Sequence, residues 1–249
     1  DVRDTRGITV EEIIRKHQAY WAWQQSITPR YVARTQTDLR FSIGPTAERF
    51  EVSIAGPQFF DGDRLTDWLW EEFFVNGVRW RYGKFPELPI VQSEKVTQLP
   101  LAINLTNEYR YQLAGEEQIG PFDTWEVRFT PPADAPDDLP LYRGTVWIDK
   151  RTFARVRIRK IQLNLKGDVL SNEELTDYAT FDASTSSRVE REAAVGMTPR
   201  SILWLPESIS MQMVVSTITR PLAVERRTSF SEFRLQPVDF TEQYERASE

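Results

Sequence analysis

The chain contains one histidine, His17, which is therefore its only imidazole able to exchange a proton near neutral pH. His17 lies beside Tyr20 and Trp21 in a segment with helical spacing of apolar residues, where a histidine more often packs at the edge of a core. The serines at positions 184–187 lie in no nucleophile-elbow pattern, and no glycine-rich phosphate loop occurs. We predict that the protein is not an enzyme, unless folding brings His17 together with a carboxylate and a hydroxyl.

Three aspartates, Asp61, Asp63 and Asp67, are close enough in sequence to suggest a calcium site, because this cation prefers several oxygen ligands. The spacing of a helix–loop–helix calcium site is missing, and Arg64 would repel a cation. We interpret the segment as a solvated turn. We expect no metal ion and no other cofactor.

Two pairs of glutamates carry the groups that acid–base catalysis would need, Glu71 with Glu72 and Glu173 with Glu174. Adjacent residues on a strand point to opposite faces of a sheet, so neither pair forms a catalytic dyad by itself. These carboxylates are expected to face different surroundings.

Three arginines alternate with apolar residues along one predicted strand, at Arg155, Arg157 and Arg159. Such a row is typical of a solvated sheet face whose arginines pair with carboxylates on neighbouring strands. The alternative is a row that binds anions or lipid headgroups. The eight tryptophans are open to two interpretations as well, because large rings can line a cavity or fill a core.

Composition excludes several classes of protein. The 31 basic residues are scattered among 37 acidic ones, so nucleic acid is not an expected partner. The absence of cysteine excludes disulfides and thiolate metal sites. No window of about 18 uncharged apolar residues occurs, so the sequence predicts no membrane-spanning helix. An exported protein whose signal peptide has been removed would look the same, so composition suits either the cytoplasm or an exported bacterial protein.

The segment 9–25 is predicted to be an amphipathic helix that Pro29 prevents from continuing. Thr9 and Glu12 form a capping-box pattern, which would provide partners for two backbone amides at the start of the helix. The side chains that recur on one side of this helix are Ile13, His17, Tyr20, Trp21 and Gln24.

Beyond Pro29 the apolar period changes from helical to two, which indicates strands. The clearest local signal is Asn76-Gly77, the dipeptide most suited to a two-residue hairpin turn. Predicted strands cover 31–43, 50–54, 68–75, 78–82, 125–129, 142–148, 153–165, 173–181, 202–204, 209–217 and 224–235. Segments predicted to be loops or irregular are 56–66, 83–100, 131–140 and 183–198, with a short helix at 101–109.

The alternation along 153–165 shifts by one position, since Val156 and Ile158 share one face but Ile161 and Leu163 do not follow it. A β-bulge near Lys160 would explain the shift. Helices do not alternate with strands inside the chain, so we predict a mainly β (α+β) fold with an antiparallel sheet. We expect one domain over 1–249 whose ends, 1–8 and 238–249, fray.

Three segments resemble the lipoprotein-carrier (LolA/LolB-like) superfamily, the outer-membrane lipoprotein-sorting proteins of the bacterial periplasm and their uncharacterised relatives. They are the helix at 10–16, the strand pair 142–149 and 152–155, and the closing strand 228–233. The resemblance implies a strongly curved antiparallel sheet that forms an incomplete barrel, with the N-terminal helix packed on its concave side. It also implies that the concave side holds acyl chains and that the protein is located in the periplasm or cell envelope.

We therefore expect non-enzymatic binding of a lipid, a lipidated protein or another apolar ligand on the concave side. The expected partners are an apolar small molecule, a lipid or lipoprotein acyl chains, and an envelope protein is a further candidate. The alternative is a protein-interaction or scaffold domain of a larger envelope protein, with a core filled by its own rings. Candidates for the cavity lining are Tyr20, Trp21, Phe41, Trp70, Phe74, Trp80, Val146, Ile158 and Met211.

Overall fold

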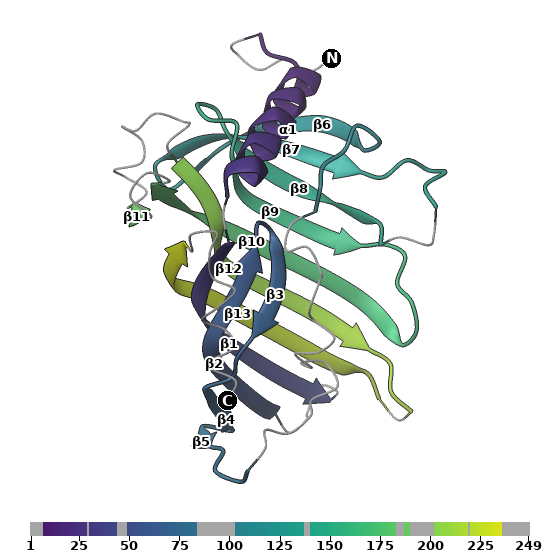
Figure 1. The fold of residues 1–249 in the computed structure, drawn as a ribbon. Coiled ribbons are helices and arrows are strands. Elements are labelled where there is room, and N and C mark those ends of the chain that lie inside the picture. The colour runs from purple at the N-terminus through teal and green to yellow at the C-terminus, as the bar shows by residue number, and fades with distance from the viewer. Residues whose placement is uncertain are drawn as a thin grey trace.

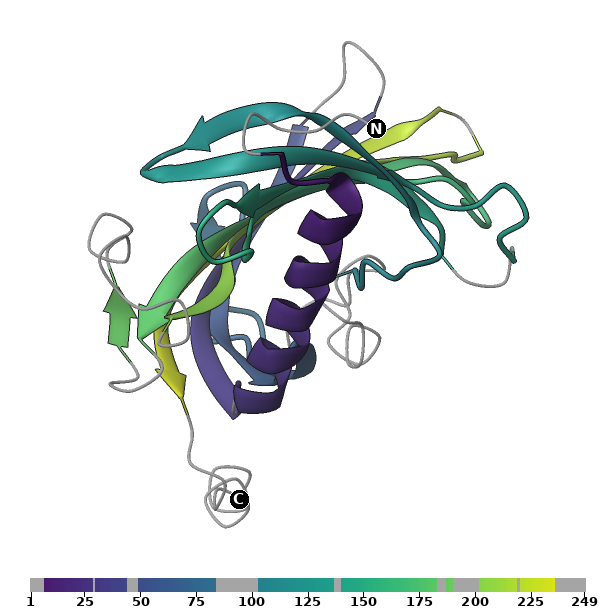
Figure 2. The same cartoon turned by 90° about the horizontal axis from the view of Figure 1, so that it is seen from above.

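The computed structural model of the chain shows one open, strongly curved sheet with a single helix on its concave side (Figures 1 and 2). It describes residues 7–28, 30–43, 49–83, 103–136, 140–182, 187–189, 202–218 and 220–235. All strand pairs are antiparallel, and the main path of the sheet is β5-β4-β2-β1-β13-β12-β10-β9-β8-β7-β6. Because β5 and β6 at its ends do not pair with each other, the barrel is incomplete. The predicted fold class is confirmed.

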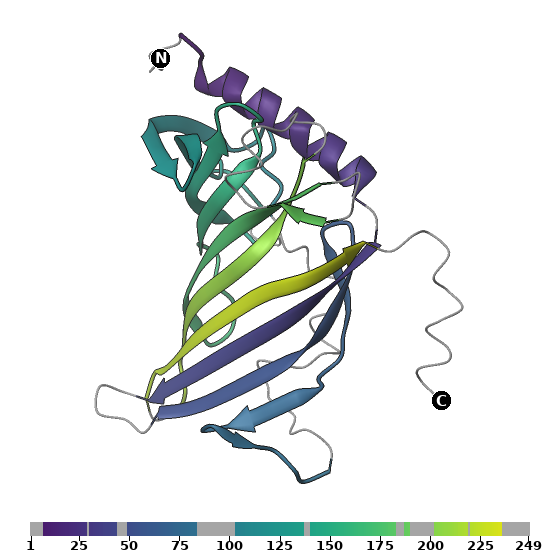
Figure 3. The same cartoon turned by 90° about the vertical axis from the view of Figure 1, so that its left-hand side faces the viewer.

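The elements have the following bounds: α1 Val10–Ile27, β1 Arg30–Ile43, β2 Arg49–Asp61, β3 Arg64–Trp68, β4 Glu72–Val75, β5 Val78–Arg79, β6 Arg110–Ile119, β7 Phe122–Thr130, β8 Tyr142–Asp149, β9 Arg155–Gln162, β10 Val169–Asp182, β11 Ser187–Val189, β12 Ile202–Val215 and β13 Leu222–Leu235. The helix lies at one end of the curved sheet, whereas β4 and β5 lie at the opposite end (Figure 3).

The helix α1 begins as predicted, with Thr9 as the residue that caps it. The backbone amide of Glu12 donates to Thr9 Oγ1 at 3.3 Å. In the predicted capping box the Glu12 carboxylate would accept from the Thr9 amide. It pairs with Lys16 instead, since it lies 2.9 Å from Lys16 Nζ one turn later. The helix ends at Ile27 and is followed by Thr28, whose amide and hydroxyl both donate to Gln24 O. The buried residues of α1 are Ile13, Ile14, His17, Trp21 and Gln24, and Tyr20 is half-buried.

Two predicted hairpins are confirmed. Strand β1 pairs with β2 along its whole length, and its odd positions from Tyr31 to Leu39 are buried. The turn between them lies outside the described residues. In the β4–β5 hairpin, Asn76 and Gly77 have φ values of 48° and 76°, which is the doubly positive pair that a type I′ turn requires.

The predicted loop at 56–66 is wrong, because β2 continues to Asp61 and β3 begins at Arg64. The sequence signals for a loop were Pro57, Gly62 and their charged neighbours. Gly62 lies in the turn between β2 and β3, but Pro57 lies within β2. On one side β2 pairs with β4 up to Ala55 and with β3 from Gln58 onward, so Pro57 lies where the partner changes. Its missing N–H therefore breaks neither ladder.

The predicted bulge near Lys160 is also wrong. The irregularity in β9 lies between Arg155 and Arg157, where the pairing with β8 shifts at Val156. A bulge turns the preceding side chain to the other face of the sheet. As a result Arg155 is buried on the concave side, whereas Arg157 and Arg159 face outward.

Several further predictions need correction. Strand β6 was missed, because it is an edge strand with little apolar alternation. Residues 103–109 form turns and irregular backbone instead of a short helix, and the predicted strands at 202–204 and 209–217 are one strand, β12. The short β11 lies within the segment 183–198 that was predicted to be a loop. The irregular segment predicted at 83–100 and the chain end at 238–249 lie almost wholly outside the described residues.

Candidate ligand-binding face

The concave side of the sheet carries a continuous row of inward-facing residues that crosses nine strands. Residues paired directly across antiparallel strands share a face, so the register identifies this row. From β7 to β4 the row consists of Val127, Val146, Ile158, Thr176, Ile209, Thr228, Thr37, Ile54 and Phe73. Each of these residues is buried. The row joins three apolar clusters, which we call the helix cluster, the middle cluster and the hairpin cluster.

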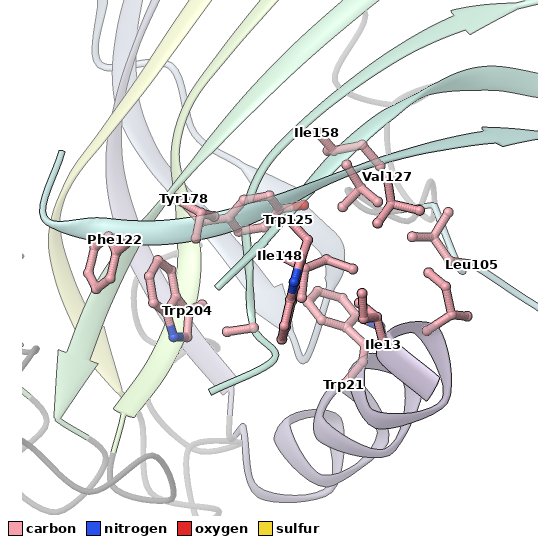
Figure 4. Close-up of a cluster of buried hydrophobic side chains, with 14 of the residues drawn as sticks. Ile13, Trp21, Leu105, Phe122, Trp125, Val127, Ile148, Ile158, Tyr178 and Trp204 are labelled. Atoms are coloured by element: carbon pink, nitrogen blue, oxygen red, sulfur yellow. The ribbon is translucent and has the colours of Figure 1, made fainter. Parts of the chain in front are cut away.

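The helix cluster lies between α1 and strands β6 to β10 together with the first residues of β12. Ile13 and Trp21 project from α1 towards Trp125 and Ile148 of the sheet (Figure 4). The middle cluster is built on β1, β2, β10, β12 and β13, around Phe60 and its neighbours. The hairpin cluster surrounds Leu39, Ile54 and Phe73 at the far end of the sheet.

Side-chain hydrogen bonds to backbone groups hold α1 over the helix cluster. Gln24 Nε2 donates to Trp204 O at 3.0 Å, and Trp204 N donates to Gln24 Oε1 at 2.8 Å. The Tyr20 hydroxyl donates to Ile202 O at 2.7 Å, and burial raises the pKa of Tyr20 so that it remains a donor. Gln18 Nε2 donates to Leu105 O at 2.7 Å. These bonds join α1 mainly to the first residues of β12.

His17 and Arg155 meet beneath the helix. Arg155 Nη2 lies 3.4 Å from His17 Nε2 and donates to Ile103 O at 3.1 Å. Its guanidinium carbon lies 4.7 Å from the centroid of a Trp21 ring, a cation–π distance. Burial, together with the Arg155 charge, lowers the pKa of His17 to about 3, although the hydrogen bond to Phe153 O acts in the opposite direction. His17 is therefore neutral at pH 7 and serves as a packed residue.

This burial predicts a dependence of stability on pH. The unfolded chain protonates His17 near its ordinary pKa of 6.5, whereas the folded chain holds it neutral down to about 3. The stabilisation from neutral His17 is therefore complete above pH 6.5 and falls as the pH is lowered, with a limiting slope of about 1.4 kcal/mol per pH unit. Urea unfolding between about pH 5 and 6.5, where few carboxylates titrate, should show this slope in the wild type and a flatter one in His17→Gln. Equal slopes would contradict the assignment.

The concave face is not apolar throughout. Lys160, Glu174 and Arg226 lie on it in one row, next to the buried row that joins the clusters. Lys160 Nζ lies 2.8 Å from Glu174 Oε1, and Arg226 Nη2 lies 3.9 Å from Glu174 Oε2. We call these three residues the polar belt.

The residues predicted to line a cavity lie in different parts of this face. Trp21, Val146 and Ile158 belong to the helix cluster, and Tyr20 packs against it. Phe41, Trp70 and Trp80 pack against the hairpin cluster. Met211 is buried between Glu174 and Arg226 in the belt row. Phe74 is the exception, because it follows Phe73 along β4 and therefore points to the opposite face of the sheet, whereas Phe73 occupies the hairpin cluster.

The acidic residues singled out by sequence have ordinary partners. Asp61 lies 3.4 Å from Arg30, Asp63 accepts from Gln25, and Asp67 accepts from the amide of Trp68. Within the described ranges, no group of three or more potential ligands could hold a metal ion. Glu173 and Glu174 divide between faces, since Arg159 binds Glu173 outside and Lys160 binds Glu174 inside. Glu71 precedes β4, and its carboxylate lies 2.8 Å from Arg34 Nη1.

The cavity beneath the end of α1 is small. It has a volume of about 20 Å³ and lies between Trp21, Tyr31, Tyr178 and Trp204. That volume holds about one water molecule. A larger cavity of about 190 Å³ lies at the other end of β9 and β10, lined by Gln162, Asn172 and Met213 among others.

No family model and no curated protein matches the chain. Several solved structures are similar to it at low sequence identity. One is an outer-membrane lipoprotein-sorting protein domain from Vibrio parahaemolyticus, with 11% identity over 95% of this chain and 96% of that one, and a TM-score of 0.38. Another is a LolA superfamily protein from Nitrosomonas europaea, with 14% identity over 92% and 98% and a TM-score of 0.34. A DUF1329 family protein from Desulfovibrio piger has 13% identity over 93% and 96% and a TM-score of 0.40.

Likenesses at these identities and TM-scores carry no argument about function. No helix in the described ranges combines the length and the apolar content that crossing a bilayer requires.

Proposed function

We propose that the chain binds an apolar molecule, such as a lipid or the acyl chains of a lipoprotein, on the concave side of its sheet without catalysing a reaction. The observation that carries this proposal is the continuous inward-facing row that joins three apolar clusters. Among the described elements, only α1 crosses the concave side as a helix (Figure 2). Since one helix covers the curved sheet, movement of that helix alone would let a ligand enter or leave the concave side.

Binding of an acyl chain beneath α1 requires the helix to move, because the cavity there has a volume of only about 20 Å³. Each buried methylene contributes about 0.8 kcal/mol, so a tail of ten methylenes supplies about 8 kcal/mol before the costs of association. The hydrogen bonds from Gln18, Tyr20 and Gln24 contribute about 1 kcal/mol each in net terms. The gain from burying a tail thus exceeds the cost of breaking these hydrogen bonds.

The cellular setting belongs to the same proposal. A bacterial periplasm or cell envelope supplies lipids and lipoproteins in contact with water, and a chain without cysteine functions there without forming disulfides. An envelope protein that carries acyl chains is the corresponding macromolecular partner.

One observation favours the second candidate, a protein-interaction domain with a core filled by its own rings. Trp125 and Trp204 are 2% and 1% exposed and occupy the helix cluster. If α1 does not move, these rings leave no room for a ligand, and the open edge strand β6 becomes the surface available for pairing with a partner.

Titration with a fluorescent acyl probe, combined with native mass spectrometry of protein recovered from a bacterial membrane extract, tests the leading proposal. We expect one bound lipid per chain and a dissociation constant of about 1 µM or lower for the probe. Trp21→Ala, on the inner face of α1, should weaken probe binding about tenfold, whereas Trp23→Ala should leave it unchanged. A lipid-free spectrum together with no probe uptake by folded protein would contradict the proposal.

A further inference from the structure

The polar belt carries more positive than negative charge. Lys160 and Arg226 share the single carboxylate of Glu174, and Glu174 Oε1 also lies within hydrogen-bond distance of Thr176 Oγ1 at 3.3 Å. Within the described residues, no second carboxylate forms an ion pair with either cation. Since the belt lies on the concave side beside buried Met211, it places a surplus positive charge inside the half-barrel.

The two cations are not equally satisfied. Lys160 Nζ lies 2.8 Å from Glu174 and 5.3 Å from the centroid of the Tyr142 ring. Arg226 reaches Glu174 only at 3.9 Å, and its Nε is buried without a hydrogen-bond partner in the part of the chain that the structure describes. Burial lowers the pKa of Arg226, against the effect of Glu174. Arg226 would therefore gain more than Lys160 from binding a further anion, because its planar guanidinium can bind a carboxylate or phosphate with two hydrogen bonds.

The surroundings of the belt offer room and further polar atoms. Asn172 lies on the same face of β10 as Glu174, two positions away, and its Nδ2 donates to Gln162 Oε1 at 3.1 Å. Its Oδ1 is buried without a partner in the described part of the chain. Asn172 and Gln162 line the cavity of about 190 Å³, together with Met213, which is paired with Asn172. A ligand in this cavity therefore lies beside the belt.

Apolar surface continues from the belt row. Arg226 is paired with Leu39, which belongs to the hairpin cluster, and Leu39 is paired with Val52 of the same cluster. Two residues further along each strand, the buried row leads to the middle and helix clusters. The charged group and the apolar surface are thus parts of one face.

We propose that the polar belt binds the anionic head of an amphiphile, a carboxylate or a phosphate, whose tail lies on the adjoining apolar clusters. The inference rests on the proposed function, since it specifies which apolar molecules the concave side selects. Arg226 forms the principal contact with the anionic head, and Lys160 forms the second. When no ligand is bound, Glu174 is the anion that pairs with both side chains.

The test compares dodecanoate and dodecyl phosphate with dodecanol, which has the same tail and no charge. For the wild type we expect both anions to bind about tenfold more tightly than the alcohol in calorimetric titrations. This preference should be lost in Arg226→Gln and reduced in Lys160→Gln. It should be kept in Arg227→Gln and Arg159→Gln, because these residues lie next to the belt residues in sequence but face outward. Glu174→Gln should strengthen binding of the anions and leave that of dodecanol unchanged.

The outcomes separate this inference from the function on which it rests. Equal affinity for dodecanoate and dodecanol would overturn the headgroup site and leave apolar binding intact. Binding of none of the three probes would overturn apolar binding as well. If acetate or inorganic phosphate competes as strongly as the amphiphiles, the site binds free anions and the inference is wrong. Arg226→Lys keeps the charge, so it provides a folded comparison if Arg226→Gln does not fold, and it should retain part of the preference.

Discussion

Trp204→Ala is expected to lower the free energy of unfolding by about 3–5 kcal/mol, the range for removing a fully buried large aromatic side chain. Trp204 is 1% exposed, and its ring centroid lies 4.7 Å from that of Phe122. It joins the sheet to α1, because both of its backbone polar groups bind Gln24. Urea unfolding followed by circular dichroism measures the loss.

Trp147→Ala is the matched control for this prediction. Trp147 is half-buried on the outer face of β8, where its Nε1 donates to Glu117 at 2.7 Å. Its replacement should cost well under half as much as that of Trp204, since little apolar surface is uncovered. Equal losses from the two variants would show that the helix cluster is not the main core of the protein.

Gln24→Ala is expected to cost about 2–3 kcal/mol, although only a polar side chain is removed. Strand β13 pairs with β12 only from Ser208 onward, so within the described ranges no neighbouring strand reaches the Trp204 amide and carbonyl on that side. The side-chain amide of Gln24 takes the place of a strand: its Oε1 accepts from Trp204 N at 2.8 Å, and its Nε2 donates to Trp204 O at 3.0 Å. Its loss leaves two buried backbone groups without partners, and α1 loosens over the helix cluster.

This variant also links stability to function. If α1 moves to admit a ligand, Gln24→Ala should bind the fluorescent acyl probe faster than the wild type in stopped-flow experiments. Gln25→Ala, on the exposed side of the same helix turn, should change neither the association rate nor the unfolding free energy by a measurable amount. A destabilised Gln24→Ala with an unchanged association rate would indicate that ligands reach the concave side without moving α1.

The sequence was informative where structure follows from local chemistry. The cap at Thr9 and the turn at Asn76-Gly77 depend on neighbouring residues only, and both are present as predicted. The alternation along β1 likewise identifies one buried face. Local signals failed at Pro57, because the change of strand partner that tolerates a proline involves residues distant in sequence.

The candidate site depends on such distant relations. Arg155 was predicted to face solvent with Arg157 and Arg159, and a one-residue register shift places it inside instead. The polar belt combines residues from three strands, and only the strand order and register bring Arg226 to Glu174. The available signal was a charged residue, Arg226, at a position where the alternation predicts an inward-facing side chain. The sequence does not reveal which strands lie beside β13, so it could not identify the partner of Arg226.

The central claim is that an apolar ligand occupies the space between α1 and the sheet. Methyl NMR of isoleucine-labelled protein with dodecanoate tests it most directly. The account predicts intermolecular contacts and shift changes at Ile13, Ile148 and Ile158, which line the helix cluster, and none at Ile218, which is fully exposed. Changes confined to exposed methyl groups such as Ile218, or no change at saturating dodecanoate, would contradict it.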